Sequence, residues 1–179
     1  MTTARSTILS ALVLFTFAGK AQDLAQHLPD AEIERIFHEG ELAGRKGDHD
    51  KAIALFTQVI ERDPEHINAY LQRGFSQSMS KHYELAVADL TSVIRLKNDH
   101  LWAYTSRGSA YNKLGRQTEA LRDFDMALSL DPKDQEAYNN RGWSKKALGD
   151  LKGACKDWKT SKKLGNGEAA IILMNNNCK

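Results

Sequence analysis

The sequence predicts an all-helical repeat protein, because residues of the same kind recur every 34 positions along most of the chain. Glycine, alanine and a large apolar residue each recur in this register, and a proline or asparagine closes each copy. The four columns are Gly40, Gly74, Gly108 and Gly142; Ala52, Ala86, Ala120 and Ala154; Phe56, Leu90, Phe124 and Trp158; and Pro64, Asn98, Pro132 and Asn166. Agreement across four copies indicates one structural unit repeated along the chain.

The first half of each copy is expected to be a helix, as the third copy illustrates. Leu101, Tyr104, Gly108 and Tyr111 follow the three-and-four spacing of a buried helical face. Gly115 is expected to end this helix, since glycine accepts the left-handed backbone conformation that is common at helix C-termini.

The second half predicts another helix, whose apolar stripe consists of Ala120, Leu121, Phe124, Ala127 and Leu128. Asp131-Pro132 is expected to close it, because the residue before a proline is pushed out of helical geometry. We expect the glycine of the first helix to face the alanine of the second, so that the two helices approach closely. The large apolar side chain would then fill the space behind them.

This pattern resembles the tetratricopeptide repeat over residues 33–168, with copies at 33–66, 67–100, 101–134 and 135–168. The resemblance implies an α-α superhelix, a solenoid of four helix-turn-helix repeats with a concave inner face. Such a stack needs a polar cap at each end. The apolar column Ile60, Ile94, Leu128 ends in Lys162, and residues 168–177 resemble a short helix. We therefore assign 169–179 to a capping helix and the C-terminus.

The N-terminus has the layout of a secretory signal peptide over residues 1–21. Arg5 supplies a positive charge, an apolar run covers 8–17, and small residues precede a cleavage point after Ala21. The run is shorter than the roughly 20 residues of a spanning helix, although an uncleaved anchor is the alternative. Residues 22–32 would form a lead-in segment. We expect an exported protein, periplasmic or secreted, with no transmembrane segment in the mature chain.

Charge and motifs exclude several classes of function. Cleavage removes Arg5 and Lys20, so the 25 basic residues fall to 23 and equal the 23 acidic ones. This balance gives no electrostatic signature of nucleic-acid binding. The histidines do not converge on a metal-ligand spacing, and no nucleophile is paired with a base. Gly165-x-Gly167-x-x-Ala170 follows a helix, whereas a dinucleotide fingerprint follows a strand. The sequence therefore predicts no enzyme, no metal and no cofactor.

The two cysteines are expected to fasten the cap. If the capping helix runs antiparallel to the helix before it, Cys178 at its end lies beside Cys155 near the start of the other. An exported chain can keep such a disulfide. The alternative is a buried free Cys155 and a frayed C-terminus. The stretch 153–159, Leu164-Gly165 and Cys178 also resemble the closing repeat of certain bacterial envelope proteins.

Charged residues recur in the repeat register too, as Arg73, Arg107 and Arg141 and as Asp89, Asp123 and Asp157. The first repeat has Glu39 and Leu55 at these two positions, so both partners are absent together. This joint absence favours an ion pair within each repeat, although the arginine of the next repeat is a second candidate. Even spacing indicates a structural role for these pairs, not a catalytic one.

The resemblance implies that the first helix of each repeat lines the concave face. The corresponding positions are Phe37, Glu41, Leu71, Phe75, Trp102, Thr105, Ser109, Asn139, Trp143 and Lys146. Five of them are large and apolar, which is typical of an interaction surface. We expect a groove that holds a protein or peptide segment. The alternative for Trp102 and Trp143 is that each is packed, over the preceding turn or beneath the cap.

Some members of the family hold acidic chaperone C-termini with basic residues and asparagines on this face. Phe37, Glu41, Leu71 and Phe75 stand at those positions here, which disfavours capture of a carboxylate tail. The sequence therefore predicts a non-catalytic adaptor or scaffold that binds a protein segment. A structural subunit of an envelope or secretion assembly, or a self-associating solenoid, is the alternative.

Overall fold

The computed structural model describes residues 31–178, and every regular element in that range is a helix. A helical segment over 31–45 comes first. It is followed by α2 (His49–Arg62), α3 (Ile67–Met79), α4 (Tyr83–Leu96), α5 (Leu101–Lys113), α6 (Gln117–Leu130), α7 (Gln135–Ala147), α8 (Leu151–Lys163) and α9 (Glu168–Asn175). The predicted signal peptide at 1–21 and the lead-in as far as residue 30 lie outside the described residues.

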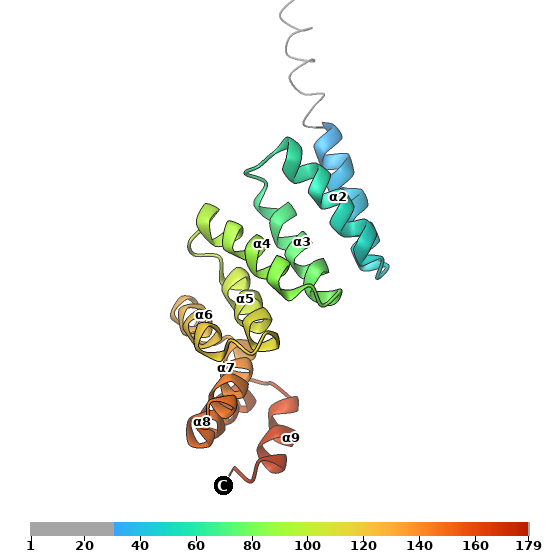
Figure 1. Ribbon diagram of the computed structural model, residues 1–179. Helices are drawn as coiled ribbons and strands as arrows, with labels where there is room; N and C mark the ends of the chain where they lie inside the picture. The colour runs from blue at the N-terminus through green and yellow to red at the C-terminus, as the bar shows by residue number, and fades with distance from the viewer. Residues whose placement is uncertain (1–30, 179) are drawn as a thin grey trace, which may run out of the picture.

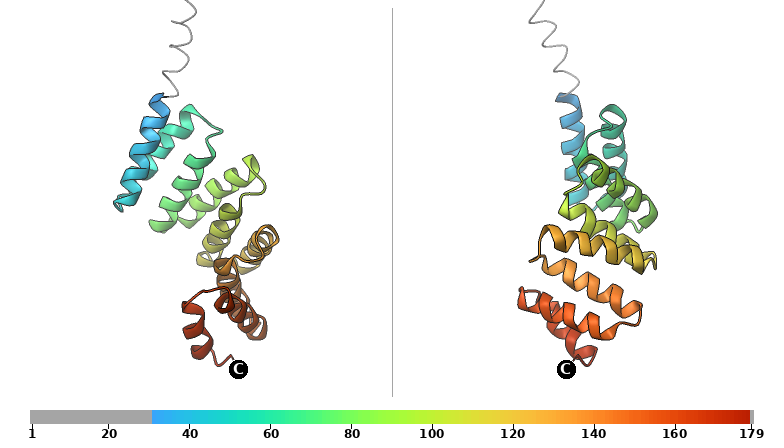
Figure 2. Two further views of the ribbon diagram at one scale, coloured as in Figure 1. Left: turned by 180° about the vertical axis from the view of Figure 1, so that it is seen from behind. Right: turned by 90° about the vertical axis from the view of Figure 1, so that its left-hand side faces the viewer.

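The helices form pairs that stack one upon another, so the described chain begins and ends at opposite ends of the stack (Figures 1 and 2). Helices α3 and α4, α5 and α6, and α7 and α8 pack as pairs, and each pair contacts the next through α4·α5 and α6·α7. Helix α9 packs on α8 and covers part of the last pair (Figure 1). The predicted solenoid of four helix-turn-helix repeats with a capping helix is confirmed.

The helix ends follow from single residues. Helix α5 ends at Lys113, and Gly115 then takes a φ of 74°, a left-handed conformation that carries no steric cost for glycine. Asp131 is the extended residue that ends α6 before Pro132. Both predicted helix ends are confirmed. His66 and His100, whose role the sequence did not reveal, cap α3 and α5 by accepting the N–H of Ala69 and Ala103.

The core repeats with the chain, but its packing differs from the expectation in one respect. A Cβ atom at Gly108 would lie 2.8 Å from Cε1 of Phe124, and a Cβ atom at Gly40 would lie 2.7 Å from the same atom of Phe56. The large side chain therefore lies directly over the glycine, not behind an alanine that faces it. The first helix of the repeat packs on the ring itself, and this is why the position excludes a side chain.

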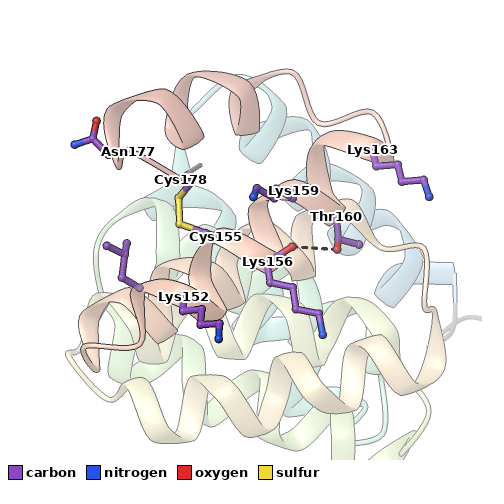
Figure 3. Close-up of a pocket in the computed structure, with 9 residues that line it drawn as sticks. Lys152, Cys155, Lys156, Lys159, Thr160, Lys163, Asn177 and Cys178 are labelled. Carbon is purple, nitrogen blue, oxygen red and sulfur yellow. Dashed lines mark hydrogen bonds between the residues drawn. A yellow bond between two sulfur atoms is a disulfide. The ribbon is translucent and has the colours of Figure 1, made fainter.

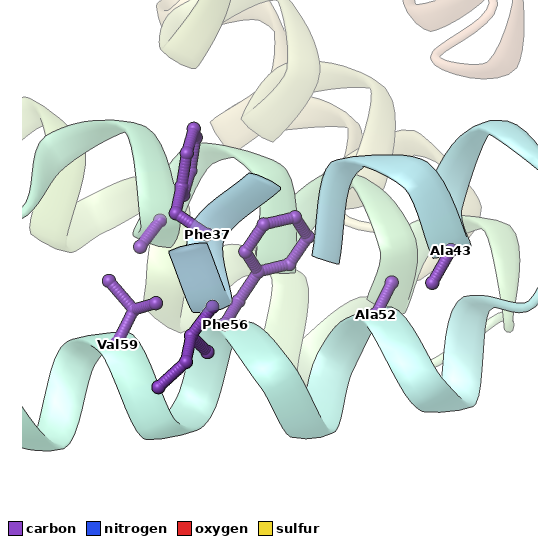
Figure 4. Packing of buried hydrophobic residues seen from close by; sticks show 7 residues of the cluster. Phe37, Ala43, Ala52, Phe56 and Val59 are labelled. Carbon is purple, nitrogen blue, oxygen red and sulfur yellow. The ribbon is translucent and has the colours of Figure 1, made fainter. Parts of the chain in front are cut away.

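The first repeat contains the N-terminal core cluster, in which Phe37, Ala43, Ala52, Phe56 and Val59 are buried together (Figure 4). The rings of Phe37 and Phe56 are tilted against each other, with centroids 5.5 Å apart. Side chains of this kind contribute on the order of 2 kcal/mol each when fully buried. Two further clusters lie along the stack, and each includes side chains from neighbouring repeats.

Candidate functional site

The first helices of the repeats lie on the inner side of the stack. Helix α5 contacts both α3 and α7 directly, whereas contacts among the second helices α4, α6 and α8 are fewer. A curved stack brings the helices on its inner side closest together, so this asymmetry identifies α3, α5 and α7 as the inner row. We call their solvent-facing side chains, with those of segment 31–45, the inner face.

Three aromatic side chains of the inner face are exposed to solvent. Phe75 on α3 is 54% exposed, Trp102 on α5 is 69% exposed and Trp143 on α7 is 41% exposed. Each comes from a different repeat, and none of these three rings stacks on another in the described chain. Large apolar side chains exposed on three successive inner helices make this face a candidate interaction surface.

Trp143 is both packed and accessible. Its ring packs at 64° against the buried Trp158 ring, with centroids 5.1 Å apart, and the Nζ atom of Lys146 lies 5.2 Å from its centroid. The contact with Trp158 fixes the orientation of the indole, while 41% of the residue stays exposed. Trp102 has the larger exposed fraction of the two, so it does not pack over the preceding turn.

A small pocket of about 140 Å³ opens on the inner face between segment 31–45 and α3. Glu41 and Phe75, two of the residues predicted for a groove, both line it, and so does Phe56. Gly44, Arg45, Gln72 and Ser76 complete the lining. The pocket places one carboxylate and one guanidinium beside an exposed aromatic ring.

Two of the predicted site residues lie in or against the core. Phe37 is 9% exposed and packs between Phe56 and the imidazole of His66, so it is not available to a partner. Leu71 is half-buried against the cluster built from Leu90 and Val93. A large apolar residue on the inner side of a helix is covered wherever the neighbouring repeat supplies a surface for it.

Thr105 and Ser109 make hydrogen bonds to the next repeat. The Thr105 hydroxyl donates to the Asp134 carboxylate at 3.3 Å, and the Asn140 amide donates to the Ser109 hydroxyl at 3.4 Å. Asn112 and Ser144, which the sequence did not single out, extend this network: the Ser144 hydroxyl donates to Asn112 at 2.8 Å. These residues join α5 to α7. Apart from Ser144, whose position is also serine in the second repeat (Ser76), these residue types do not recur in the 34-residue register, so periodicity gave little sign of them.

Asn139 is packed through its backbone, but its side-chain oxygen has no hydrogen-bond donor among the described residues. Its backbone carbonyl accepts the indole N–H of Trp158 at 3.1 Å, while its Oδ1 atom is buried without a hydrogen-bond partner in the described chain. An unmatched buried acceptor costs roughly 1–3 kcal/mol. A donor from water or a bound segment would remove that cost.

The repeated ion pairs form within each repeat, as the sequence favoured. Nε and Nη2 of Arg73 donate to the two carboxylate oxygens of Asp89, each at 2.7 Å, and Arg107–Asp123 and Arg141–Asp157 repeat this geometry. The hydrogen bonds that Arg73 donates to Asp89 raise the pKa of Arg73 above its ordinary value. Each guanidinium donates two hydrogen bonds to one carboxylate, which fixes the orientation of both side chains. This geometry fits a structural role.

Nη1 of each arginine reaches the preceding repeat, but at a side chain two residues beyond the aspartate column, so the alternative pairing of an aspartate with the arginine of the next repeat is not the one formed. Nη1 of Arg73 donates to Thr57 at 2.9 Å, that of Arg107 to Thr91 at 3.0 Å, and that of Arg141 to Asp125 at 2.7 Å. Each arginine therefore ties two repeats together.

The C-terminal end carries a second concave surface that the sequence analysis missed. A pocket of about 680 Å³ lies between α8 and the end of α9 (Figure 3). Four lysines with helical spacing line it: Lys152, Lys156, Lys159 and Lys163. Cys155 and Cys178 also line it, with Cα atoms 5.5 Å apart, and Figure 3 shows a disulfide between them.

Within residues 31–178, no group of three or more histidine, cysteine, aspartate or glutamate side chains is placed to hold a metal ion. Within the same range, no helix has the length and apolar character needed to cross a bilayer.

Comparison with known proteins identifies the repeat. Two family models described as tetratricopeptide repeat match residues 34–66 and 101–134. The solved structure titled MamA MSR-1 C2 has a TM-score of 0.68 at 25% identity, covering 74% of this chain and 76% of that one. MamA from Desulfovibrio magneticus RS-1 has a TM-score of 0.71 at 23% identity, with coverage of 74% and 75%.

A third similar structure contains a bound peptide. The first tetratricopeptide-repeat domain of Spaghetti (RPAP3), bound to the HSP90 peptide SRMEEVD, has a TM-score of 0.64 at 26% identity. It covers 65% of this chain and 93% of that domain. No curated protein sequence matches the chain.

Proposed function

The chain is a tetratricopeptide-repeat protein, and from that premise we propose that it is a non-catalytic adaptor whose inner face binds a segment of a partner protein. The observation that carries the proposal is the row of exposed aromatic side chains, Phe75, Trp102 and Trp143, on three successive inner helices. Aromatic side chains of this kind are the commonest energetic anchors of protein interfaces. The peptide held by the RPAP3 domain is a precedent for segment binding by this fold.

The chemistry of the inner face defines the segment that it would take. The face combines exposed rings with the paired charges of Glu41 and Arg45, while Phe37 is buried in the core and Leu71 is half-buried against it. This pocket therefore offers an acidic tail no net positive charge. We expect a segment with large apolar side chains spaced to meet the rings, and polar residues between them.

Affinity capture with the full chain from an extract of the native organism tests the proposal. The inner-face variant is Phe75→Ala/Trp102→Ala. Its matched control is Leu85→Ala/Met126→Ala, which removes two exposed apolar side chains from the second helices α4 and α6. A partner held by wild type and control should bind the inner-face variant about thirtyfold more weakly, the loss expected for an aromatic anchor.

Equal capture by all three proteins would place binding elsewhere and refute the inner-face proposal. If wild type captures no partner and instead sediments as an oligomer, a self-associating solenoid replaces the adaptor. Circular dichroism of each variant separates loss of binding from loss of fold.

We also propose that the protein is exported to the bacterial periplasm or beyond, with cleavage after Ala21. The supporting pattern is the charged, apolar and small-residue order of positions 1–21. Cell fractionation followed by N-terminal sequencing tests it. Export predicts a mature protein that begins at residue 22, and recovery from the cytoplasm with the first 21 residues intact contradicts it.

A further inference from the structure

The pocket between α8 and α9 has a strongly basic lining. Lys152, Lys156, Lys159 and Lys163 follow one another at intervals of four, three and four residues, which places them on one face of α8. An adjoining pocket of about 410 Å³ shares Lys159 and adds Lys162. Neither pocket has an aspartate or glutamate in its lining. We call the two together the α8–α9 groove.

This arrangement of lysines is unfavourable for the helix itself. Like charges three or four residues apart on a helix repel each other, and Lys152, Lys156, Lys162 and Lys163 form no ion pair with another described residue. The equivalent face of α6 carries Thr118, Arg122, Asp125 and Ser129, a mixture of charges. The concentration of one sign is therefore a property of α8 and not of the repeat.

Other residues of α8 and the end of the chain complete the groove. Leu151, Cys155 and Cys178 line the larger pocket, and Leu173 and Met174 of α9 line the adjoining one. Met174 is exposed to solvent. A ligand in the groove would meet ammonium groups along one side and apolar atoms along the other.

We propose that the α8–α9 groove binds an acidic, extended protein segment. Lys152 and Lys163 are eleven residues apart, which corresponds to about 16 Å along the helix axis. An extended chain advances about 3.3 Å per residue, so a segment of about five residues spans the lysines. Glutamate or aspartate on such a segment would pair with the lysines, and an interspersed apolar residue would face Met174.

Two features favour a peptide over other polyanions. The lysines line a concave space with α9 beside it, and a flat bilayer surface does not enter such a space. The lining contains no aromatic ring or arginine on which a nucleic-acid base could stack. This site goes beyond the inner-face proposal, because α8 belongs to the row of second helices.

Fluorescence anisotropy with the full, disulfide-bonded chain and fluorescein-labelled hexaglutamate tests the proposal, with hexaglutamine as the uncharged probe. The groove variant is Lys152→Gln/Lys156→Gln/Lys163→Gln. The control variant, Lys46→Gln/Lys97→Gln/Lys133→Gln, loses the same charge from exposed positions elsewhere. We expect hexaglutamate to bind wild type and control alike, and the groove variant at least about tenfold more weakly. Binding should also weaken as sodium chloride rises from about 50 mM to about 300 mM.

Several outcomes would overturn the proposal. They are no binding of hexaglutamate to wild type, equal binding of hexaglutamine, and equal losses in the groove and control variants. Binding to phosphatidylglycerol vesicles without binding to hexaglutamate would assign the lysines to a membrane surface instead. The Phe75→Ala/Trp102→Ala protein should bind hexaglutamate as wild type does, so failure of the inner-face proposal leaves this test unaffected.

Discussion

The first repeat and the three that follow it use different side chains at the same two positions. In the third repeat, Arg107 and Asp123 share two hydrogen bonds of 2.8 Å and are largely buried. In the first, Glu39 is exposed and bonded to Arg35, and Leu55 packs against the N-terminal core cluster. The helix pair forms in both cases, so the ion pair is not required to make a repeat.

The difference indicates what the arginine adds. Its third donor contacts the preceding repeat, as Arg73 contacts Thr57. The first repeat supplies that acceptor but carries no arginine of its own. A bidentate guanidinium with a further contact fixes the distance and angle between two repeats, which apolar packing alone specifies less sharply. The ion pairs therefore serve mainly to align successive repeats.

Asp123→Ala is expected to have the largest effect. It leaves the Arg107 guanidinium buried without its carboxylate, and removing one partner of a buried pair costs about 3 kcal/mol. Glu39→Ala, at the arginine position of the first repeat, should change stability little because Glu39 is exposed. Urea unfolding followed by circular dichroism measures both. Equal losses would show that the two repeats do not differ as described.

The double variant Arg107→Met/Asp123→Leu sharpens the same comparison. It removes both charges and fills the space with apolar atoms, so it should be more stable than Asp123→Ala. If alignment of repeats is the role of the pair, a double variant that retains stability should show faster amide exchange where α5 meets α4. Exchange identical to wild type would argue for a purely energetic role.

We expect a disulfide between Cys155 and Cys178 to distinguish the last repeat from the first, and this gives the second-largest prediction. A disulfide between residues 23 apart contributes on the order of 3 kcal/mol by the chain-entropy estimate. Reduction, or Cys155→Ala/Cys178→Ala, should release α9 first and raise amide exchange at 168–178 while α5 and α6 stay protected. Thiol titration under denaturing, non-reducing conditions should find no free thiol, and two reactive thiols would contradict the link.

The sequence predicted the features that depend on residues at fixed separations along the chain. It did not predict those that depend on which side chains pack together in space. Helix ends at Gly115 and Asp131 and the pairing of Arg107 with Asp123 follow from residues at fixed separations. Phe37 and Phe75 are both aromatic residues predicted for the inner face, yet one is buried and one exposed, because the surrounding side chains decide. The lysine spacing of α8 is readable in the sequence, but the groove exists only because α9 packs beside it.

The glycine column tests whether the repeats also differ in their apolar packing. In Gly108→Ala the new Cβ would lie 2.8 Å from the Phe124 ring, whereas in Gly74→Ala it would lie 3.2 Å from Cγ of the flexible Leu90. Overpacking typically costs 1–3 kcal/mol, and alanine returns about 1 kcal/mol of helix propensity. We expect Gly108→Ala to lose about 1–2 kcal/mol and Gly74→Ala to change stability by less than about 0.5 kcal/mol, as measured by thermal unfolding. Equal losses would mean that the Leu90 side chain adjusts to the new methyl group no better than the Phe124 ring does.

The smallest predicted effect concerns the helix caps, which differ between repeats at one position. His100 caps α5 in the third repeat, and Asp134 caps α7 in the fourth, where its carboxylate accepts the N–H groups of Glu136 and Ala137. Burial lowers the pKa of His100 below its ordinary 6.5, because desolvation disfavours the imidazolium. The protonated ring also cannot accept the N–H of Ala103.

The sign of the pH dependence follows from this lowered pKa. Between the folded pKa and about 6.5 the unfolded chain binds more protons, so the stabilisation is complete above that range and is lost as the pH falls through it. The loss should not exceed about 1 kcal/mol, the usual contribution of an N-cap hydrogen bond. His100→Asn keeps a neutral cap, so urea midpoints at pH 7.5 and pH 5 should lie closer together in the variant than in wild type. If the two midpoints lie equally far apart in the variant and in wild type, His100 does not cause the pH dependence. The loss of stability at pH 5 would then come from other groups.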